Sequence, residues 1–390
     1  MRETRKLKYL CYILDEYRKP ISAEKRNQNS DMLYDYYGAS GAIDKIDGYT
    51  IDDHVMLIGE DGANLVFRNL PLMYEVNGKA WINNHAHILK PREDVDFYYL
   101  FYALENADIF PFVTGSAQPK LNQENLKLIP IPITNYETQK HIASFIKSKC
   151  KRIDSLITDI QSQIETLEEY KRSVITEAVT KGLDPDVEMR DSGVQWIGEI
   201  PTHWTLIRIG SLYGLRTQKV SDIDYPPLSV TKMGVLPQLD TVAKTNAHDD
   251  RKLVVKGDFV INSRSDRRGS CGISDYTGSV SLINTVLFPI TEMNPRYYNW
   301  YFHTVGFADE FYRWGHGIVD DLWTTGWHDM KNILISVPPL DEQQRIADYL
   351  DSKCAEIDNI ITEKKQQIET IEEYKKSLIF EYVTGKKEVV

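Results

Sequence analysis

The chain has 390 residues, of which 42% are hydrophobic, so it is long enough to bury two or more cores. Its 57 aspartates and glutamates exceed its 46 lysines and arginines, which gives a formal net charge of −11. Because nonspecific phosphate binding needs a basic surface, this charge argues against a protein that coats nucleic acid by itself and restricts any DNA contact to a local surface or a basic partner.

Residues 1–134 are predicted to form a first globular unit of mixed α/β structure. Strand-like runs such as His54 to Ile58 alternate with glycines, and an aromatic helix over Phe97 to Tyr102 leads to a loop, Thr114 to Leu121, and a strand, Leu128 to Ile133. The basic N-terminal segment lacks the apolar core of a signal peptide. No apolar run in the chain reaches the roughly 18 residues of a membrane-spanning helix, so we expect a cytoplasmic protein.

Residues 135–181 are predicted to form one long helix with a coiled-coil seam. Apolar side chains recur at alternating steps of four and three residues, the pattern by which two helices pack along each other. These residues are Ile146, Cys150, Ile153, Ile157, Ile160, Ile164, Leu167, Val174 and Ala178. A helix of this length indicates a spacer, and the alternative is an amphipathic helix that packs on an ordinary core.

Residues 182–204 contain glycines and prolines but no seam, so we interpret them as a linker. Residues 205–340 are predicted to form a second mixed α/β unit. It again has an aromatic helix around Tyr297 to Tyr301, a glycine-containing loop, and a strand from Asn332 to Val337. Outside these landmarks the two units have little sequence in common.

Residues 341–385 are predicted to form a second long helix that repeats the first. Residues 148–180 align without a gap with residues 352–384 at a constant offset of 204, and 20 of the 33 pairs are identical, which indicates an internal duplication. The second seam contains Leu350, Cys354, Ile357, Ile361, Ile368, Ile371 and Leu378. Because one helix enters the second unit and the other leaves it, packing along the seams requires an antiparallel pair with a pseudo-two-fold repeat.

Motifs for catalysis or metal binding are weak. Residues Asn294 to Tyr297 approach the Asn/Asp-Pro-Pro-aromatic loop of amino-methyltransferases, but arginine replaces the second proline, and a helix start explains the motif better. His85 and His87 would project to one side of a strand, but the sequence identifies no third metal ligand. The four cysteines are too widely spaced to suggest a zinc site. We therefore predict no catalytic residue, cofactor or metal.

The order of variable unit, long helix, variable unit and long helix resembles the specificity subunit of a type I restriction-modification system. Residues 194–201 with Trp204 resemble the segment that opens the recognition domains of that family, and residues 338–346 with Ile357 and Asp358 resemble the entry into its second spacer helix. The stretches 36–41, 59–64, 83–87 and 114–118 look like one recurring class of recognition domain. The resemblance covers essentially the whole chain.

This resemblance implies a non-catalytic subunit with two target recognition domains, separated by two long antiparallel coiled-coil helices. Each domain would read one half of a bipartite double-stranded DNA site. The helices, with seam residues Ile153, Ile157, Ile164, Leu167, Ile357, Ile361, Ile368 and Ile371, would dock two adenine-N6 methyltransferase subunits. Restriction subunits would join that core.

Candidate base-reading residues lie on polar loops, because arginine is the usual partner of guanine, and asparagine or glutamine of adenine. In the second unit the most basic loop follows the strand Asp258 to Asn262 and contains Ser263, Arg264, Ser265, Arg267, Arg268 and Ser270. In the first unit the candidates are Asn64, Asn84, His85, Gln118 and Lys120. Rigid scaffolds usually carry recognition on such loops, although a solvated loop is the alternative.

Two other classes of function remain open on the sequence alone. A self-sufficient methyltransferase or nuclease would need catalytic and cofactor motifs that we do not find. A coiled-coil adaptor that binds only proteins would have the same helices but would retain no DNA sequence selectively.

Overall fold

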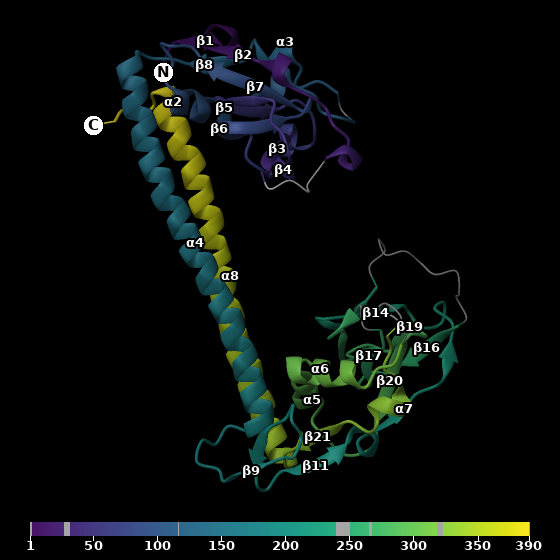
Figure 1. Cartoon of the computed structure of the whole chain (residues 1–390). Coiled ribbons are helices and arrows are strands. Elements are labelled where there is room, and N and C mark those ends of the chain that lie inside the picture. Colours follow the sequence, from purple (N-terminus) through teal and green to yellow (C-terminus); the bar gives the residue numbers. More distant parts are fainter. Residues whose placement is uncertain are drawn as a thin grey trace. The chain divides into compact units, whose positions relative to one another are not determined.

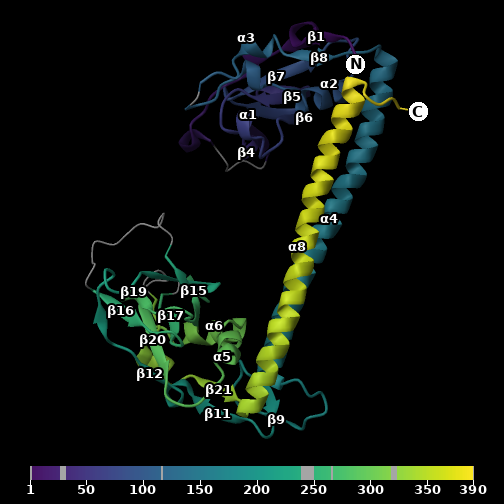
Figure 2. The same cartoon turned by 180° about the vertical axis from the view of Figure 1, so that it is seen from behind.

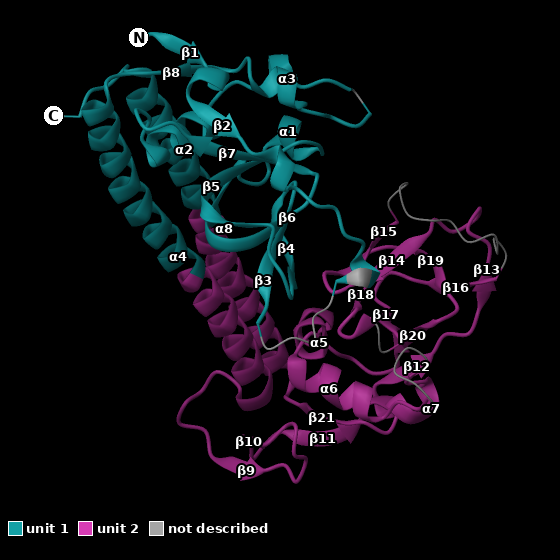
Figure 3. Ribbon diagram, turned by 45° about the horizontal axis from the view of Figure 1, so that its top comes forward, with its two compact units in different colours: residues 1–161, 365–390 teal, residues 162–364 magenta. Residues whose placement is uncertain are grey.

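The computed structural model describes residues 2–26, 32–115, 117–238, 250–264, 267–317 and 323–389. The chain divides into two compact units (Figure 3). Unit 1 consists of Met1–Gln161 with Lys365–Val390, and unit 2 consists of Ser162–Lys364. Each unit therefore contains one globular portion together with part of each long helix, and the predicted mixed α/β fold with two long helices is confirmed.

Unit 1 is built on a six-stranded sheet with the strand order β2-β7-β5-β6-β3-β4 (Figure 1). These strands are β2 (Cys11–Ile13), β3 (Tyr34–Gly38), β4 (Gly41–Ile46), β5 (Ile51–Gly59), β6 (Met73–Ile82) and β7 (Ala86–Pro91). A separate antiparallel pair joins β1 (Thr4–Lys6) to β8 (Pro130–Pro132). The short helices are α1 (Asn64–Phe67), α2 (Phe97–Glu105) and α3 (Gln123–Leu126).

The main core of unit 1 joins its sheet to α2 and to the two long helices, α4 (Tyr136–Lys181) and α8 (Leu340–Thr384). One face of α2 is buried through Tyr99, Leu100, Ala103 and Leu104, because apolar residues recur there at three- and four-residue steps. The same core contains Ile142 and Ile146 of α4 and Leu378, Ile379 and Val383 of α8. The C-terminal part of the chain thus completes the N-terminal unit.

Unit 2 contains several smaller antiparallel sheets. A four-stranded sheet has the order β12-β20-β17-β18, with β12 (Tyr213–Leu215), β17 (Phe259–Asn262), β18 (Cys271–Ile273) and β20 (Asn284–Pro289). A three-stranded sheet contains β13 (Lys219–Val220), β16 (Arg251–Val254) and β19 (Gly278–Ser281). The two-stranded pairs are β14 (Leu228–Thr231) with β15 (Gly234–Pro237), and β11 (Thr205–Arg208) with β21 (Leu334–Val337).

Helices α5 (Pro295–Phe302), α6 (Val305–Arg313) and α7 (Trp327–Met330) complete unit 2. An aromatic core packs α5 and α6 against the four-stranded sheet, with Tyr213, Phe259, Tyr298, Phe302 and Phe307 among its rings. Val174 and Ala178 of α4 and Ile346, Ala347 and Leu350 of α8 belong to the same core.

The segment interpreted as a linker, residues 182–204, is part of the folded unit 2. It forms an antiparallel pair of β9 (Met189–Asp191) and β10 (Glu199–Pro201). Ile197, Ile200 and Trp204 are buried in the unit 2 core, and the Trp204 indole donates a 2.7 Å hydrogen bond to Glu342. The glycines and prolines of this segment mark its turns, so the interpretation as a bare linker was too simple.

In unit 1, α4 and α8 are antiparallel (Figure 1, Figure 2). The ring centroids of Phe145 and Tyr382 lie 4.6 Å apart. Further along α4, the Asp154 carboxylate lies 2.5 Å from the Lys375 ammonium. A step forward along α4 is therefore a step backward along α8, as the predicted pseudo-two-fold repeat requires.

In unit 2 the same antiparallel relation holds. Lys364 donates a 2.5 Å hydrogen bond to Gln163, and Lys171 lies 2.7 Å from both carboxylate oxygens of Asp358. Lys171 and Lys375 are 204 residues apart, as are Asp154 and Asp358, so the two Lys–Asp pairs are repeat equivalents. Lysines that interrupt the apolar seam are thus matched by polar partners on the other helix, which fixes the register of the pair.

No helix among the described residues combines the length and the apolar character that crossing a lipid bilayer requires.

Candidate nucleic-acid interface

The basic loop of unit 2 connects β17 to β18, and we call residues 263–270 the arginine loop. Asn262, the last residue of β17, accepts a 3.1 Å hydrogen bond from the backbone N–H of Arg264 and so orders the start of the loop. The backbone of Arg264 also pairs with Thr324, and Thr325 N–H donates to the Ser263 carbonyl at 3.0 Å. The loop is therefore tied to the segment that follows α6.

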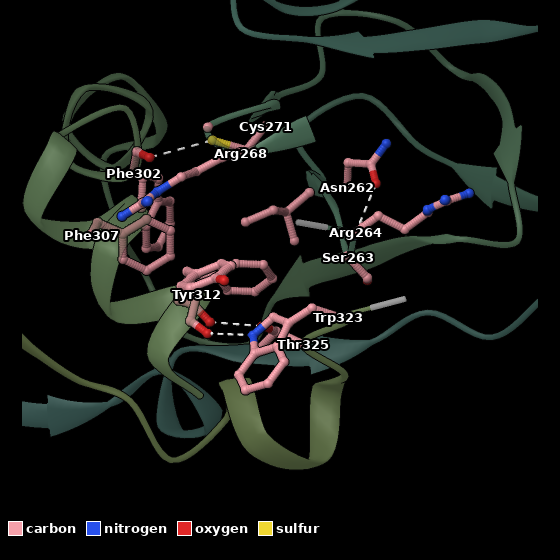
Figure 4. A pocket seen from close by; sticks show the side chains of 14 residues that line it. Asn262, Ser263, Arg264, Arg268, Cys271, Phe302, Phe307, Tyr312, Trp323 and Thr325 are labelled. Atoms are coloured by element: carbon pink, nitrogen blue, oxygen red, sulfur yellow. Dashed lines mark hydrogen bonds between the residues drawn. The ribbon is translucent and has the colours of Figure 1, made fainter. Parts of the chain in front are cut away.

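The arginine loop borders a small pocket with aromatic walls, which include Phe302, Phe307 and Trp323 (Figure 4). The Arg268 guanidinium lies 5.1 Å from the centre of the Tyr312 ring and forms an ion pair with Asp309. Arg264 extends away from these rings in the same view. Helix α6 thus holds Arg268 by charge and by a cation–π contact.

The candidate residues of this loop differ in their availability to a ligand. Arg267 and Arg268 are exposed and Arg264 is half-buried. Ser270 is only 5% exposed, and the Ser263 hydroxyl lies 2.9 Å from that of Thr285, so both serines serve the packing of the loop in this conformation. Ser265 lies outside the described residues.

In unit 1 the structure brings three of the candidate stretches together around residues 60–62. Leu121 N–H donates to the Glu60 carbonyl at 2.7 Å, and Gly62 N–H donates to the Pro119 carbonyl at 3.0 Å. The turn before Pro119 needs Gly115, because this residue has a φ of +83° and a Cβ there would lie 2.5 Å from the Gln118 carbonyl oxygen. This arrangement exposes the Gln118 side chain at the surface.

His85 and Lys120 belong to this surface and are partnered by acidic residues. His85 Nδ1 lies 2.7 Å from Asp61, and the Lys120 ammonium lies 3.1 Å from Glu60. We call these four residues the histidine cluster. Each of the two side chains, His85 and Lys120, is held by a carboxylate but remains about half exposed, so it can still contact a ligand from the solvent side.

The remaining two candidates of unit 1 are placed differently. Asn84 is exposed beside His85. Asn64 accepts a hydrogen bond from Leu70 N–H at 2.8 Å and donates one to the Pro71 carbonyl at 3.1 Å, so its amide stabilises the turn after α1. A contact from Asn64 to DNA would have to replace those bonds.

A polar network that the sequence did not reveal lies beneath the histidine cluster and contacts it through Glu60. His87 is 1% exposed, with Nδ1 2.7 Å from Asp15 and Nε2 2.8 Å from the Leu121 carbonyl oxygen. Arg18 forms ion pairs with both Asp15 and Glu60. Because Asp15 and Arg18 lie far from residues 60 and 87 in the chain, no local pattern marks these contacts.

The two central carboxylates of this network are stabilised as anions. Burial by itself raises the pKa of Asp15, but hydrogen bonds from His87 and the Ile88 N–H, and the charges of His87 and Arg18, lower it overall. Burial likewise opposes ionisation of Glu60, whereas Arg18 and Lys120 make the net shift of its pKa downward. The network therefore holds the Asp15 and Glu60 carboxylates, as anions, beneath an exposed polar surface.

A pair of repeat-equivalent contacts attaches the aromatic helix of each unit to the long helices. In unit 1 the Tyr99 hydroxyl donates to the Val383 carbonyl at 3.2 Å, and Gln139 accepts a 2.9 Å hydrogen bond from the Asp96 N–H. These contacts hold the N-terminus of α2 against α4 and α8.

In unit 2 the Tyr297 hydroxyl donates to the Val179 carbonyl at 3.1 Å, and Gln343 accepts a 2.9 Å hydrogen bond from the Asn294 N–H. Val179 and Gln343 each lie 204 residues from their unit 1 equivalents, Val383 and Gln139. The offset of the repeat is thus the sequence signal that could have identified this attachment. Asn294 caps the N-terminus of α5, which agrees with the predicted helix start.

The eight helix residues predicted for partner binding lie along the seam of α4 and α8. Each is buried or half-buried, as the heptad pattern predicts, so the seam itself offers little surface to a partner. They are Ile153, Ile157, Ile164, Leu167, Ile357, Ile361, Ile368 and Ile371. Away from the seam, Tyr170 in unit 2 and Tyr374 in unit 1 are repeat equivalents and are 49% and 58% exposed.

Among the described residues, no group of three or more histidine, cysteine, aspartate or glutamate side chains is arranged to hold a metal ion. The four cysteines are all buried and unpaired with one another. Burial raises the pKa of the Cys271 thiol to about 12, which leaves it in the unreactive thiol form.

Comparison with known proteins identifies similar sequences over most of the chain. Residues 2–166 and 203–370 match the family model described as type I restriction modification DNA specificity domain. The chain is 27% identical over 368 residues to S.HindORF215P of Haemophilus influenzae, by name a type I restriction enzyme specificity subunit. The alignment covers 93% of this chain and 89% of that relative. It is 26% identical over 318 residues to the MjaVIII specificity subunit of Methanocaldococcus jannaschii, covering 75% and 70%.

Two solved structures share the fold at low sequence identity. A chain from a type I R-M system, solved in work on its complex assembly and conformational transition, superposes with a TM-score of 0.70 at 14% identity and covers 99% of this chain and 98% of that one. The HsdS subunit of Thermoanaerobacter tengcongensis superposes with a TM-score of 0.51 at 14% identity, covering 99% and 97%.

Proposed function

Because the chain belongs to the type I restriction-modification DNA specificity family, we propose that it selects the DNA sequence on which a type I complex acts. In this proposal units 1 and 2 each read one half of a bipartite double-stranded site. The helices α4 and α8 dock two methyltransferase subunits, and restriction subunits join that core. The chain itself contributes recognition and assembly but no catalytic step.

The difference between the two candidate surfaces supports two distinct half-sites. Unit 2 presents the arginine loop, whose exposed Arg267 suits a guanine edge. Unit 1 presents an imidazole, an ammonium and amides on the histidine cluster and around it. Both surfaces are carried by units with the same Tyr and Gln attachment to the helices. A common scaffold with different loops is what two readers of different sequences require.

The exposed residues that the two helices share are the observation that carries the proposed docking of two identical partners. Some exposed side chains have no contact across the helix pair in the interactions described above, yet several of these positions are identical in both copies while the globular units have diverged. They are Thr158 and Thr362, Glu165 and Glu369, Thr166 and Thr370, Glu169 and Glu373, and Tyr170 and Tyr374. Two equivalent surfaces favour two copies of one partner.

The net charge of −11 also agrees with recognition inside a larger assembly. Nonspecific DNA affinity rises with the number of phosphates that lysines and arginines neutralise, and in this chain acidic residues outnumber the basic ones. A partner that supplies the basic surface would leave the two units to provide the base contacts.

The direct test is to combine the purified chain with methyltransferase subunits from the same genome and to map adenine methylation on a DNA library. Methylation at one bipartite sequence, lost when the chain is omitted, is the expected result. Sequence-independent methylation in the presence of the chain would overturn the proposal. Methylation by the isolated chain would instead identify a self-sufficient enzyme, and assembly without any DNA selectivity would identify a protein-only adaptor.

A further inference from the structure

The hairpin of β14 and β15 in unit 2 ends in an exposed apolar side chain. The two strands pair over four positions, from Leu228 with Pro237 to Thr231 with Gly234. Lys232 and Met233 form the tip, and Met233 is 85% exposed. Among the described residues it has the highest exposure given for a large hydrophobic side chain.

The tip of this hairpin is stiff. The Thr231 hydroxyl accepts a 3.1 Å hydrogen bond from Met233 N–H and donates one of 3.1 Å to the Gly234 carbonyl. Gly234 has a φ of +107°, a conformation that glycine adopts without strain. The backbone therefore presents Met233 at a defined place, although the side chain itself is free to adapt.

The hairpin also lies beside the arginine loop. Leu228 and Val235 are buried with valines of β16, β17, β19 and β20. A Cβ on Gly272 would lie 2.8 Å from the Gly234 Cα, so the backbones of the hairpin and of β18 are in contact. Because Gly272 follows the arginine loop by two residues and Gly234 follows Met233 directly, the backbone next to the tip contacts the backbone next to the end of the loop.

We propose that Met233 contacts the C5-methyl group of a thymine in the half-site that unit 2 reads, with Lys232 on an adjacent phosphate. Isolated exposed hydrophobic residues are common on proteins, so exposure alone would not support a site. The position does, because a two-stranded ribbon fits the major groove and the thymine methyl is the apolar feature that the groove presents. Arginine and apolar contacts from one surface would then read guanine and thymine together.

This inference depends on the proposed function, so its test uses the chain assembled with its methyltransferase subunits. Each base pair of the unit 2 half-site is varied in binding competition, with the natural complex and with Met233→Ala. The natural complex should prefer thymine at one position, and replacing that thymine by deoxyuridine should weaken binding about four-fold, the effect of one buried methyl group. The Met233→Ala complex should not respond to that replacement.

Ile223→Ala is the matched control, since Ile223 of unit 2 is 82% exposed but follows β13 rather than the hairpin. This variant should keep the full deoxyuridine effect, and an equal loss in it would overturn the assignment to the hairpin. Lys232→Gln should reduce the salt dependence of binding by about one phosphate contact and leave base preference unchanged.

Three other results would count against the inference in distinguishable ways. An unaltered base preference in Met233→Ala would overturn the thymine contact while leaving the proposed function intact. Fewer bound methyltransferase subunits in Met233→Ala, measured by native mass spectrometry, would assign the hairpin to a protein interface instead. A natural complex with no base preference at all would contradict both the proposed function and this inference.

Discussion

The hydroxyl of Tyr297 on α5 donates a 3.1 Å hydrogen bond to the carbonyl oxygen of Val179, near the C-terminus of α4. The last four carbonyls of a helix have no partner within it, and Val179 is the third residue from the end of α4. The tyrosine therefore satisfies a buried acceptor and joins the globular part of unit 2 to the long helix.

Replacing Tyr297 by phenylalanine should destabilise unit 2 by about 1 to 3 kcal/mol, because the Val179 carbonyl would stay buried without this donor. Hydrogen exchange measured by mass spectrometry should show faster exchange in α5 and at the end of α4, and unchanged exchange in unit 1. Tyr298→Phe is the matched control. The Tyr298 hydroxyl is buried with no hydrogen-bond partner among the described residues, so its removal should be neutral or stabilising. Equal effects of the two variants would contradict this role for the hydrogen bond.

The repeat-equivalent ion pairs on the long helices should set helix register. Lys171→Glu places two carboxylates together at Asp358 and should lower stability by up to about 1 kcal/mol, the scale of an exposed pair. The double variant Lys171→Glu with Asp358→Lys restores an ion pair and should recover most of the loss, measured as the urea midpoint.

A variant of the same composition provides the control. Lys171→Glu with Asp154→Lys carries the same two reversed charges, but one lies in each pair, so both Asp358 and Lys375 face a like charge. It should be the least stable of the set. Recovery in this variant would show that net charge, and not pairing across the helices, governs stability.

Tyr170 and Tyr374 should each anchor one methyltransferase subunit. Truncating a central interface tyrosine commonly costs about 2 kcal/mol or more of binding free energy. Tyr170→Ala and Tyr374→Ala should each leave a chain that retains one subunit, and the double variant should retain none, as native mass spectrometry can count. Phe380→Ala is the control, since Phe380 is 40% exposed but its repeat equivalent is Thr176. Loss of both subunits from one single variant would contradict two independent docking surfaces.

Acid should weaken unit 1 through Asp15. The pKa of Asp15 in the folded chain lies below the ordinary value of 3.8. A depressed pKa contributes stability that is complete above the unfolded-state value and is lost as the pH falls through the folded-state value. Asp15→Asn should therefore lower stability at neutral pH by about 1 to 3 kcal/mol and make the remaining stability fall less steeply below about pH 4.

Hydrogen exchange of β5 and β7 at several pH values measures this effect. Asp35→Asn removes the same charge from a residue of unit 1 whose side chain is about half exposed and pairs with Lys45 at 3.2 Å, and it should change stability by less than about 1 kcal/mol. An unchanged acid response in Asp15→Asn would assign the sensitivity of unit 1 to other groups, with Glu60 the first to examine because its pKa is also lowered.

The long helices and their antiparallel pairing followed from the sequence because the heptad pattern is a local signal and the repeat appears when the sequence is aligned with itself. The two Lys–Asp pairs, for example, are related to each other by the offset of 204. The polar loops could also be located, since glycines and strands bound them. What the sequence could not show is which polar side chains are already engaged within the chain. Asp309, which holds Arg268, is 41 residues away from it, and no periodicity links the two.

Arg267 should read one base pair of the unit 2 half-site. Its side chain is exposed on the arginine loop, and a bidentate contact between arginine and guanine is worth about 1 to 3 kcal/mol of discrimination. Arg267→Ala in the assembled complex should therefore lose selectivity at one position, while selectivity in the unit 1 half-site stays unchanged. Competition binding with every single-base variant of the site measures both.

Arg268 allows a separate test, because Asp309 and Tyr312 hold its side chain against α6. If Arg268 reaches the same groove, Asp309→Asn should alter selectivity by releasing it, and the effect should vanish when Arg268 is also replaced by alanine. Such non-additivity is expected only for residues that act through one another. Uniform weakening of all sequences by Arg267→Ala, with a smaller salt dependence, would assign Arg267 to a phosphate instead of a base, because a phosphate contact does not distinguish one base pair from another.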